Sequence, residues 1–527
     1  MPRDRRPGHQ PAFHPERRPF VSPRGGGLVS ASGGSNWQRL DPRMLAVTPL
    51  RLLGGFLPVI AVVLIIGIGG DFGSRVYGLL AGVLFVLIAG TLRWFTTRYR
   101  IDSDRVELRS GLLFRSARSI PRDRIRTVDV TAGLVHRIFR LSVLKIGTGE
   151  RSDGGESREL TLDAIAASEA DRVRQRLLDP SGAGRDHETV APAAEVLAAL
   201  RWSWLRFAPL TVSSLVALGA VGGAFAQLVN DVGAEAVDVG KVGQRLTTAP
   251  LWLGVTVLTV VILLVALVGS VLVFIEAWWG FRLVREPGGT LRIRRGLLTT
   301  RSVSLEERRL RGVAVVESLL LRAGRGARTV AVATGLGGHQ GHGRGNLLPP
   351  APTTEAHRVS GVVLAEMPSP TSTLLHRHPR AALRRRLVRA AVPVLATAVA
   401  LWFAPVPAWA MWLTLVLLLP VTVLLAVDAY RNLGHALTSH YLVTRHGAGI
   451  RATVALQRSG VIGWTVSQSL FQRRLDLVTV TATTAAGHGA YAIIDVSTSA
   501  GLAVARQAVP ELLDPFLQHE VVVPGTH

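Results

Sequence analysis

Long apolar runs alternate with polar, arginine-rich blocks along this chain, and the alternation occurs three times. A membrane core about 30 Å thick is crossed by roughly 20 apolar residues in a helix. Six runs approach that length and fall into three pairs, each joined by a link. We therefore predict six transmembrane helices in three hairpins, at residues 52–70, 76–92, 207–229, 251–275, 390–404 and 408–427. The exact ends of the fifth span stay open, because this run is the shortest and needs Leu387 and Val388 to cross.

Behind each hairpin lies a block whose apolar and polar residues alternate with the period of a half-buried strand. In the first block Val106 and Leu108 alternate with Glu107 and Arg109, and a turn follows at Ser110-Gly111. Strands are predicted at residues 119–130, 141–148, 291–295, 313–317, 329–334, 477–484 and 490–496, and closing helices at about 168–178, 354–367 and from 500 onward. A small antiparallel β-barrel or sandwich with a C-terminal helix is the economical fold for such a block.

The blocks are related to one another in sequence. Five residues of the first block recur at a constant offset of 336: Ile120, Ile125, Leu134, Arg137 and Leu141 return as Leu456, Val461, Leu470, Arg473 and Leu477. The middle block matches with small insertions, so that Ile125-Arg126 corresponds to Leu310-Arg311, and Arg137 and Arg140 to Arg322 and Arg325. A repeat of this length indicates one structural unit that is used three times.

These patterns divide the chain into ten parts. They are a disordered basic N-terminus (1–44), hairpin 1 (45–95), block 1 (96–180), a linker (181–204), hairpin 2 (205–277), block 2 (278–368), a basic juxtamembrane linker (369–386), hairpin 3 (387–429), block 3 (430–518) and a tail (519–527). The N-terminus is predicted to be disordered because it is rich in Arg, Pro, Gly and Ser and lacks apolar periodicity.

The distribution of positive charge predicts how the chain is oriented in the membrane. The formal net charge is +24, and only two of the 60 basic residues, Lys145 and Lys241, are lysines. The links inside the hairpins hold few arginines, whereas six lie between Arg377 and Arg389 on the other side of the predicted membrane. The positive-inside rule therefore predicts a multi-pass protein of the bacterial plasma membrane, with both termini and all three blocks in the cytoplasm.

One stretch of the first block resembles a known family. It runs from Ile120 to Val128 (IPRDRIRTV), continues at residues 134–141 (LVHRIFRL) and ends at Thr148-Gly149. These residues resemble the bacterial pleckstrin-homology-like (PH-like) domain of YdbT-type membrane proteins, in which a two-span hairpin precedes each domain. The resemblance covers residues 45–518 and is weaker in the second and third blocks. It implies a seven-stranded, roughly orthogonal barrel with a C-terminal helix, and it brings no catalytic residues.

The sequence offers little for catalysis or cofactor binding. The chain contains no cysteine, which excludes disulfides, thiolate metal sites and thiol nucleophiles. His339 and His342 have no carboxylate nearby that would complete a metal site. No nucleotide-binding glycine motif, catalytic triad or carboxylate pair is evident. We expect no enzyme activity, no metal and no cofactor.

The arginines of the blocks are the candidate binding residues, because a guanidinium pairs bidentately with phosphate, as in lipid headgroups. The alternative is that they mark topology and lie on solvated faces. The candidates for lipid or partner binding are Arg118, Arg122, Arg124, Arg126, Arg137, Arg301, Arg308, Arg309, Arg311, Arg322, Arg384, Arg385, Arg386, Arg458 and Arg473.

Two functional hypotheses follow. The first is a non-enzymatic membrane scaffold for envelope maintenance that presents three cytoplasmic PH-like modules to anionic lipid headgroups or to an unidentified membrane or cytoplasmic protein. The second is a component of a transport, export or lipid-handling system with the modules as cytoplasmic regulators. The predicted spans lack ionisable residues near their midplanes, which argues against ion-coupled transport. Self-association stays open, and nucleic-acid binding is not expected because the basic blocks lack interleaved aromatic residues.

Overall fold

The structure is a computed structural model, and it describes most of the chain outside the first three predicted spans. The described residues are 37–47, 94–178, 194–211, 251–335 and 343–513, with short gaps at 103, 112–115, 126 and 152–156, and the isolated residues 50, 84, 88, 90–92, 219 and 223.

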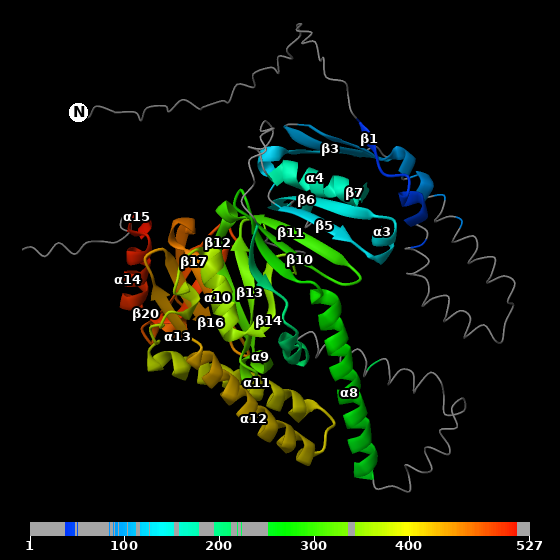
Figure 1. Ribbon diagram of the computed structural model, residues 1–527. Helices are drawn as coiled ribbons and strands as arrows, with labels where there is room; N and C mark the ends of the chain where they lie inside the picture. Colours follow the sequence, from blue (N-terminus) through cyan, green and yellow to red (C-terminus); the bar gives the residue numbers. More distant parts are fainter. Residues whose placement is uncertain are drawn as a thin grey trace, which may run out of the picture. The chain divides into compact units, whose positions relative to one another are not determined.

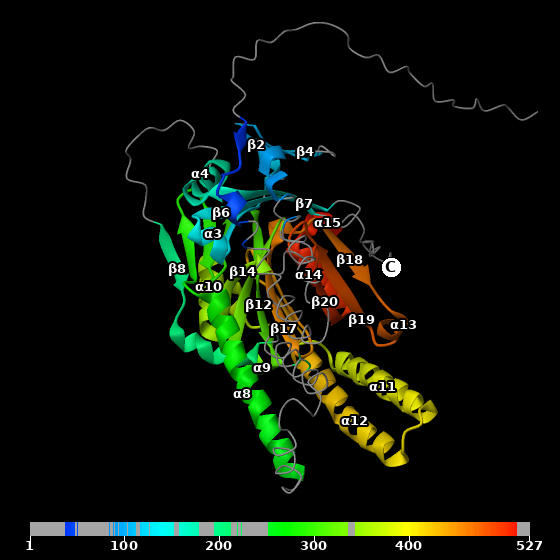
Figure 2. The same cartoon turned by 90° about the vertical axis from the view of Figure 1, so that its right-hand side faces the viewer.

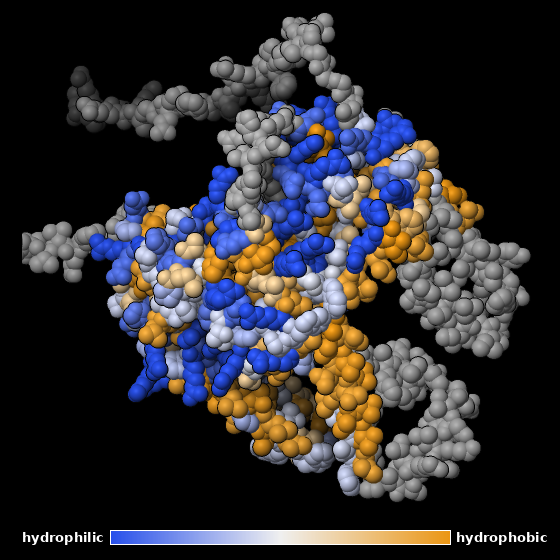
Figure 3. Space-filling view, in the orientation of Figure 1, coloured by the Kyte–Doolittle hydropathy of each residue, from blue (hydrophilic) through white to orange (hydrophobic). Residues whose placement is uncertain are grey.

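Three helices in this part of the chain are long and apolar enough to cross a membrane. They are Thr259–Trp278 within α8 (Leu251–Trp278), α11 (Arg380–Phe403) and α12 (Ala408–Arg431). They coincide with the fourth, fifth and sixth predicted spans, and Figure 3 shows α8 as a column of apolar surface below the polar modules. The first two predicted spans and most of the third lie outside the described residues.

The start of the third predicted span was placed too early. Trp202–Leu210 forms a 3-10 helix, η4, instead of the beginning of a transmembrane helix. Its side chains Trp204 and Phe207 are buried in the core of the second module. A hydropathy pattern does not distinguish residues buried in protein from residues buried in lipid, which explains the error.

Each block folds into a module of two antiparallel sheets and a closing helix (Figure 1). Module 1 contains β1 (Gln38–Arg39), β2 (Arg98–Ile101), β3 (Arg105–Ser110), β4 (Ser116–Pro121), η2 (Arg122–Arg124), β5 (Thr127–Ala132), α3 (Leu134–Ile138), β6 (Leu141–Arg151), β7 (Ser157–Ala166) and α4 (Ala167–Leu178). Buried residues of both sheets and of α4, such as Val106, Ile146 and Val173, share one core. The alternation seen in the sequence therefore points these side chains inward.

Modules 2 and 3 repeat this order. Module 2 contains β8 (Glu195–Ala199), β9 (Arg282–Glu286), β10 (Thr290–Arg295), β11 (Thr300–Glu306), η5 (Glu307–Arg309), β12 (Leu310–Ser318), α9 (Leu319–Ala323), β13 (Gly326–Ala333), β14 (Asn346–Pro352), α10 (Thr353–Leu364) and then η7 (Pro370–Ser372). Module 3 contains β15 (Gly434–Leu437), β16 (Tyr441–His446), β17 (Ile450–Gln457), η8 (Arg458–Gly460), β18 (Gly463–Ser467), α13 (Leu470–Arg473), β19 (Leu477–Thr483), β20 (Ala490–Ser497), α14 (Thr498–Ala508) and α15 (Pro510–Leu513).

The sheets do not close into barrels as the family resemblance implied. In each module a 3-10 helix separates the last strand of the first sheet from the first strand of the second sheet. Where two modules meet, the first strand of one module's second sheet pairs with the last strand of the next module's first sheet. Strand β5 pairs with β11 and β12 pairs with β17, both antiparallel. The result is a seven-stranded sheet, in the order β7-β6-β5-β11-β10-β9-β8, and a six-stranded sheet, β14-β13-β12-β17-β16-β15. Each joined sheet belongs to two modules.

Buried ion pairs reinforce the joins between modules. Arg174 of α4, which is fully buried, binds both carboxylate oxygens of Glu286 in β9 at 3.0 and 3.1 Å. Arg451 of β17 binds Glu317 of β12 at 2.6 and 2.7 Å. Bidentate guanidinium–carboxylate pairs fix both distance and orientation. The first pair holds α4 of module 1 against β9 of module 2, and the second holds β12 and β17 in register.

In modules 1 and 2 the first strand comes before the hairpin in the chain. Strand β1 pairs with β2, and β8 pairs with β9, although a predicted hairpin lies between the two strands of each pair. In module 3, His376 forms a single β-bridge to His435 of β15, on the far side of α11 and α12. The hairpins are therefore inserted into the modules, instead of preceding them as we expected. Part of the predicted linker and of the predicted disordered N-terminus forms β8 and β1.

The join between modules 2 and 3 provides a test of this architecture. A Cβ atom on Gly312 of β12 would lie 2.1 Å from the carbonyl oxygen of Ala455 in β17. Gly312→Ala should therefore destabilise the protein by ~1–3 kcal/mol, measured by thermal or urea unfolding of the purified protein. Gly463→Ala is the matched control, because its Cβ would meet nothing within 4 Å. Equal stability of the two variants would contradict the strand pairing.

Candidate anion-binding face

Each module exposes apolar side chains on the short helix that follows the first strand of its second sheet. The exposed residues are Leu134 and Ile138 on α3, Leu319 and Leu320 on α9, and Leu470 and Phe471 on α13. Leu470 and Phe471 are 78% and 66% exposed. Arg137, Arg322 and Arg473 lie on the same three helices. Exposed apolar groups beside arginine are typical of residues that contact the interface of a membrane.

Two of these helices are linked to the ends of candidate spans, α9 directly and α3 through Leu297. Arg322 of α9 donates hydrogen bonds to Asp428 in the last turn of α12 and to Asn432, which follows it. Arg137 of α3 donates to the carbonyl oxygen of Leu297, whose own N–H donates to Glu276 in α8 at 2.9 Å. The short helices α3 and α9 therefore lie near the ends of α8 and α12 (Figure 2).

A basic cavity lies between modules 1 and 2. It has a volume of about 590 Å³. Six arginines line it, against one carboxylate, that of Asp171: Arg43, Arg137, Arg140, Arg292, Arg294 and Arg301. Asp171 already pairs with Arg292 at 3.2 Å, and the hydroxyls of Ser142, Ser168 and Ser302 add hydrogen-bonding groups. Such a lining favours an anion with several oxygen atoms.

A second cavity, of about 730 Å³, occupies the corresponding place between modules 2 and 3. Arg445 takes the repeat position of Arg294, and His357 takes that of Asp171. Further cations come from both ends of hairpin 3, Arg377 before α11 and Arg431 at the end of α12. Burial lowers the pKa of His357, so its ring is neutral at pH 7. The positive charge of this cavity comes from arginine, and the carboxylate that lines it, Glu317, pairs with Arg451.

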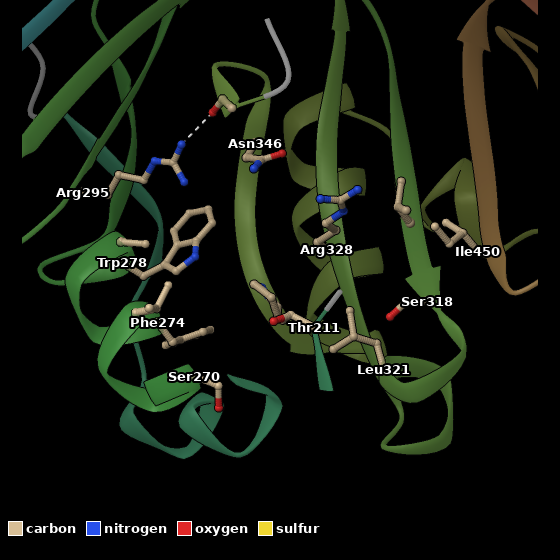
Figure 4. A pocket seen from close by; sticks show the side chains of 15 residues that line it. Thr211, Ser270, Phe274, Trp278, Arg295, Ser318, Leu321, Arg328, Asn346 and Ile450 are labelled. Carbon is tan, nitrogen blue, oxygen red and sulfur yellow. Dashed lines mark hydrogen bonds between the residues drawn. The ribbon is translucent and has the colours of Figure 1, made fainter. Parts of the chain in front are cut away.

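A third pocket, of about 340 Å³, lies at the base of α8 (Figure 4). The helix contributes an apolar wall with Phe274 and Trp278, and Arg295 and Arg328 contribute cations. The Arg295 guanidinium lies 4.2 Å from the centre of the Trp278 ring and donates to the carbonyl of Gly343 at 2.6 Å. Burial lowers the pKa of Arg295 to about 10, so it stays cationic at neutral pH. The pocket therefore has an apolar wall that suits the hydrocarbon part of an amphiphile and a cationic wall that suits its anionic part.

Comparisons with known proteins agree with this architecture. A family model described as "Bacterial PH domain" matches residues 48–181 and 388–507, which cover the first and third hairpins and modules. The UPF0699 transmembrane protein YdbT of Bacillus subtilis (strain 168) is 26% identical over 426 residues, 77% of this chain and 84% of that protein. The chain contains bacterial PH domains and is similar to YdbT-type membrane proteins. No solved structure matches it.

Most of the predicted binding arginines contact other parts of the chain. Arg309 pairs with Glu306 at 2.6 Å, and Arg311 donates to Gln457 at 3.3 Å. The other internal bonds are from Arg118 to the carbonyl of Glu159, Arg122 to the carbonyl of Arg176, Arg322 to Asp428, Arg385 and Arg386 to Asp495, and Arg458 to the carbonyls of Gln507 and Ala508. These arginines contribute to the architecture, whatever else they bind.

The remaining candidates are exposed or lie outside the described residues. Arg124, Arg301, Arg308, Arg384 and Arg473 are exposed, and Arg126 is not described. The structure brings only Arg137 and Arg301 of the predicted set into one cavity. Sequence reasoning missed the other four arginines there, since they come from separate parts of the chain: Arg43, Arg140, Arg292 and Arg294. The pairing of β5 with β11 brings modules 1 and 2 together.

No group of three or more His, Asp or Glu side chains in the described ranges is arranged to hold a metal ion. His339 and His342 lie outside those ranges.

The base of hairpin 3 predicts a pH dependence. Nε2 of His378 lies 3.0 Å from Nδ1 of the buried His435, and burial lowers the pKa of His435 to about 4. The unfolded chain binds the proton with a pKa near 6.5, so stability is full above that value and falls as the pH drops toward 4.

We therefore expect the unfolding temperature to fall between pH 7 and pH 4.5, and to fall less in His435→Asn. Scanning fluorimetry of both proteins across this range measures the difference. His440→Asn, which changes an exposed histidine, is the control. Parallel curves for wild type and His435→Asn would contradict the assignment.

Proposed function

We propose that this protein is a non-enzymatic scaffold of the bacterial plasma membrane whose module junctions bind anionic lipid headgroups. The observation that carries the proposal is the cavity lined by six arginines between modules 1 and 2. Phosphate oxygens match the bidentate geometry of guanidinium groups. The cavity also lies beside residues bonded to the end of α8, within reach of a lipid headgroup.

The energies involved suggest that these charges select particular lipids; they are not needed to attach the protein to the membrane. A basic residue near an anionic membrane surface contributes about 1 kcal/mol. Long apolar helices already anchor the chain, so this energy is not needed to hold the protein in the membrane. It is available to retain particular headgroups between two modules. A bound headgroup would contact both modules at once and stabilise their join.

The orientation supports the same proposal. The arginine-rich side of the predicted hairpins is the cytoplasmic side by the positive-inside rule. Anionic lipids give that surface its negative potential. We infer that all three PH modules lie in the cytoplasm against this surface, where they present their outer faces to protein partners in envelope maintenance.

Charge-neutralising variants test headgroup binding. Arg294 and Arg301 are exposed and line the cavity, so Arg294→Gln with Arg301→Gln should leave the fold intact. Loss of two such contacts should weaken retention of phosphatidylglycerol at most ~30-fold, from about 1 kcal/mol each. Native mass spectrometry of protein released from nanodiscs of mixed phosphatidylglycerol and phosphatidylcholine counts the lipids that stay bound.

The control carries the same change in charge elsewhere. Arg308 and Arg384 are exposed and do not line the cavity, so Arg308→Gln with Arg384→Gln should retain phosphatidylglycerol as wild type does. Equal loss of phosphatidylglycerol in both variants would show that lipid retention depends on the overall charge of the protein and not on the cavity. Equal retention in all three proteins would refute headgroup binding there.

A further inference from the structure

The two joins between modules use the same strand edges in the same register. Val128 of β5 lies opposite Ser304 of β11, and Val313 of β12 lies opposite Ala455 of β17. Val128 and Val313 occupy the same place in the repeat, and Ser304 and Ala455 each lie three residues before a 3-10 helix. The first strand of one module's second sheet therefore pairs with the last strand of the next module's first sheet, by one rule used twice.

This rule leaves one edge of each kind without a partner among the described strands. Strand β4 of module 1 corresponds to β11 and β17, and β18 of module 3 corresponds to β5 and β12. Beyond its pairing with β3, β4 has no second neighbour in its sheet, and β18 pairs only with β19. The two edges lie at opposite ends of the series of modules, in the first and the last.

Burial confirms that these edges are open. Strands β11 and β17 each contain four consecutive buried residues, whereas in β4 only Ile120 is buried. Five of the six residues of β5 are buried, and none of β18 is. The indole Nε1 of Trp464 in β18 is shielded from solvent and has no hydrogen-bond partner among the described residues. An exposed edge of this kind is a template for pairing with another chain.

We propose that β18 of one copy pairs with β4 of a second copy of this chain. The register shared by the two internal joins places Trp464 opposite Ser119, Thr465 opposite Arg118, Val466 opposite Ala117, and Ser467 opposite Ser116. Pro121, which lacks an N–H donor, takes the repeat place of Glu306 and Gln457, and both lie outside the internal joins. The proline therefore does not obstruct the pairing.

A second copy fits this edge better than an unrelated strand because both halves of the join already exist in the chain. The contact is heterologous, since it uses two different surfaces, so it generates a ring or an open chain of copies. All copies are held in one membrane with the same side facing the cytoplasm. The only rotations that preserve this orientation have an axis along the membrane normal, which favours a closed ring. Confinement to the membrane also raises the effective concentration of the two edges.

The contact would also assemble a third junction like the two inside the chain. Arg109 of β3 takes the repeat position of Arg294 and Arg445, and Arg473 of α13 takes that of Arg137 and Arg322. The proposal concerns strand edges and does not depend on headgroup binding. The variant Arg294→Gln with Arg301→Gln should therefore assemble as wild type does.

Cysteine cross-linking tests the register directly, because the chain has no cysteine of its own. Two differently tagged full-length copies are co-expressed, one with Ala117→Cys and the other with Val466→Cys, and membranes are treated with a mild oxidant. Residues directly opposite in an antiparallel pair have Cβ atoms about 4.5–5.5 Å apart, close enough for a disulfide after small adjustments. We expect a product that carries both tags.

The control moves one cysteine by one residue. Thr465→Cys places the thiol on the other face of the sheet, so its yield with Ala117→Cys should be several-fold lower. Equal yields from the two pairs would overturn the proposal. So would a disulfide formed only within one copy, capture of a different protein by Val466→Cys, or no product although both thiols react with maleimide.

Charge exchange provides a second test without cysteines. Thr465→Arg would face Arg118 and should weaken association roughly five-fold, because like charges directly opposite are destabilising. Thr465→Glu should not weaken it, and Arg118→Glu combined with Thr465→Arg should restore it. Thr465 and Arg118 are both exposed in the single copy, and the hydrogen bond that Arg118 donates to the carbonyl of Glu159 is also exposed, so these changes should leave the fold intact. Association that is the same in every variant, measured by co-purification of tagged copies, would contradict the pairing.

Discussion

The arrangement of the modules depends on one constraint: an open strand edge needs another strand to pair with. Backbone N–H and C=O groups that lose water must find other hydrogen-bond partners. In each module a 3-10 helix separates the last strand of the first sheet from the first strand of the second, so the sheets stay open. The neighbouring module supplies the missing strand at β5–β11 and β12–β17. The modules are therefore joined by continuous sheets, and the cavities with their arginines form where the sheets meet.

The same arrangement ties the membrane helices to the modules. Because the first strand of modules 1 and 2 precedes the hairpin, the chain leaves the sheet, enters the predicted membrane region and returns to the same sheet. Arg385 and Arg386 of α11 both bind the buried Asp495 of module 3, and Arg322 of module 2 binds Asp428 of α12. Removing one partner of a buried pair such as Arg385–Asp495 costs about 3–5 kcal/mol, so α11 and module 3 are held in a fixed relation.

Local patterns predicted only some of the strands, and not which strands pair. They missed β2, β7, β9, β11 and β14 to β18, and the strand predicted at 119–130 is divided by η2 into β4 and β5. Alternation located strands such as β10 and β19, and length with hydropathy located α8, α11 and α12. Strand β8 was missed because its residues, Glu-Val-Leu-Ala-Ala, have little β-propensity and are held by pairing with β9. The period of two residues shows which face of a strand is buried, but it does not show which strand lies beside its edge. Most candidate arginines consequently proved to be internal contacts, and the cavity that unites Arg137 with Arg301 was not foreseen.

Hydrogen exchange measured by mass spectrometry on the protein in nanodiscs tests the joining of the sheets most directly. Amides of interior strands open only with the cooperative unit to which they belong, whereas free edges exchange early. The account predicts that peptides covering β11 and β17 are protected as strongly as those covering β10 and β16, their neighbours in the same sheets. Rapid exchange of β11 and β17 as exposed edges, with β10 and β16 protected, would contradict it.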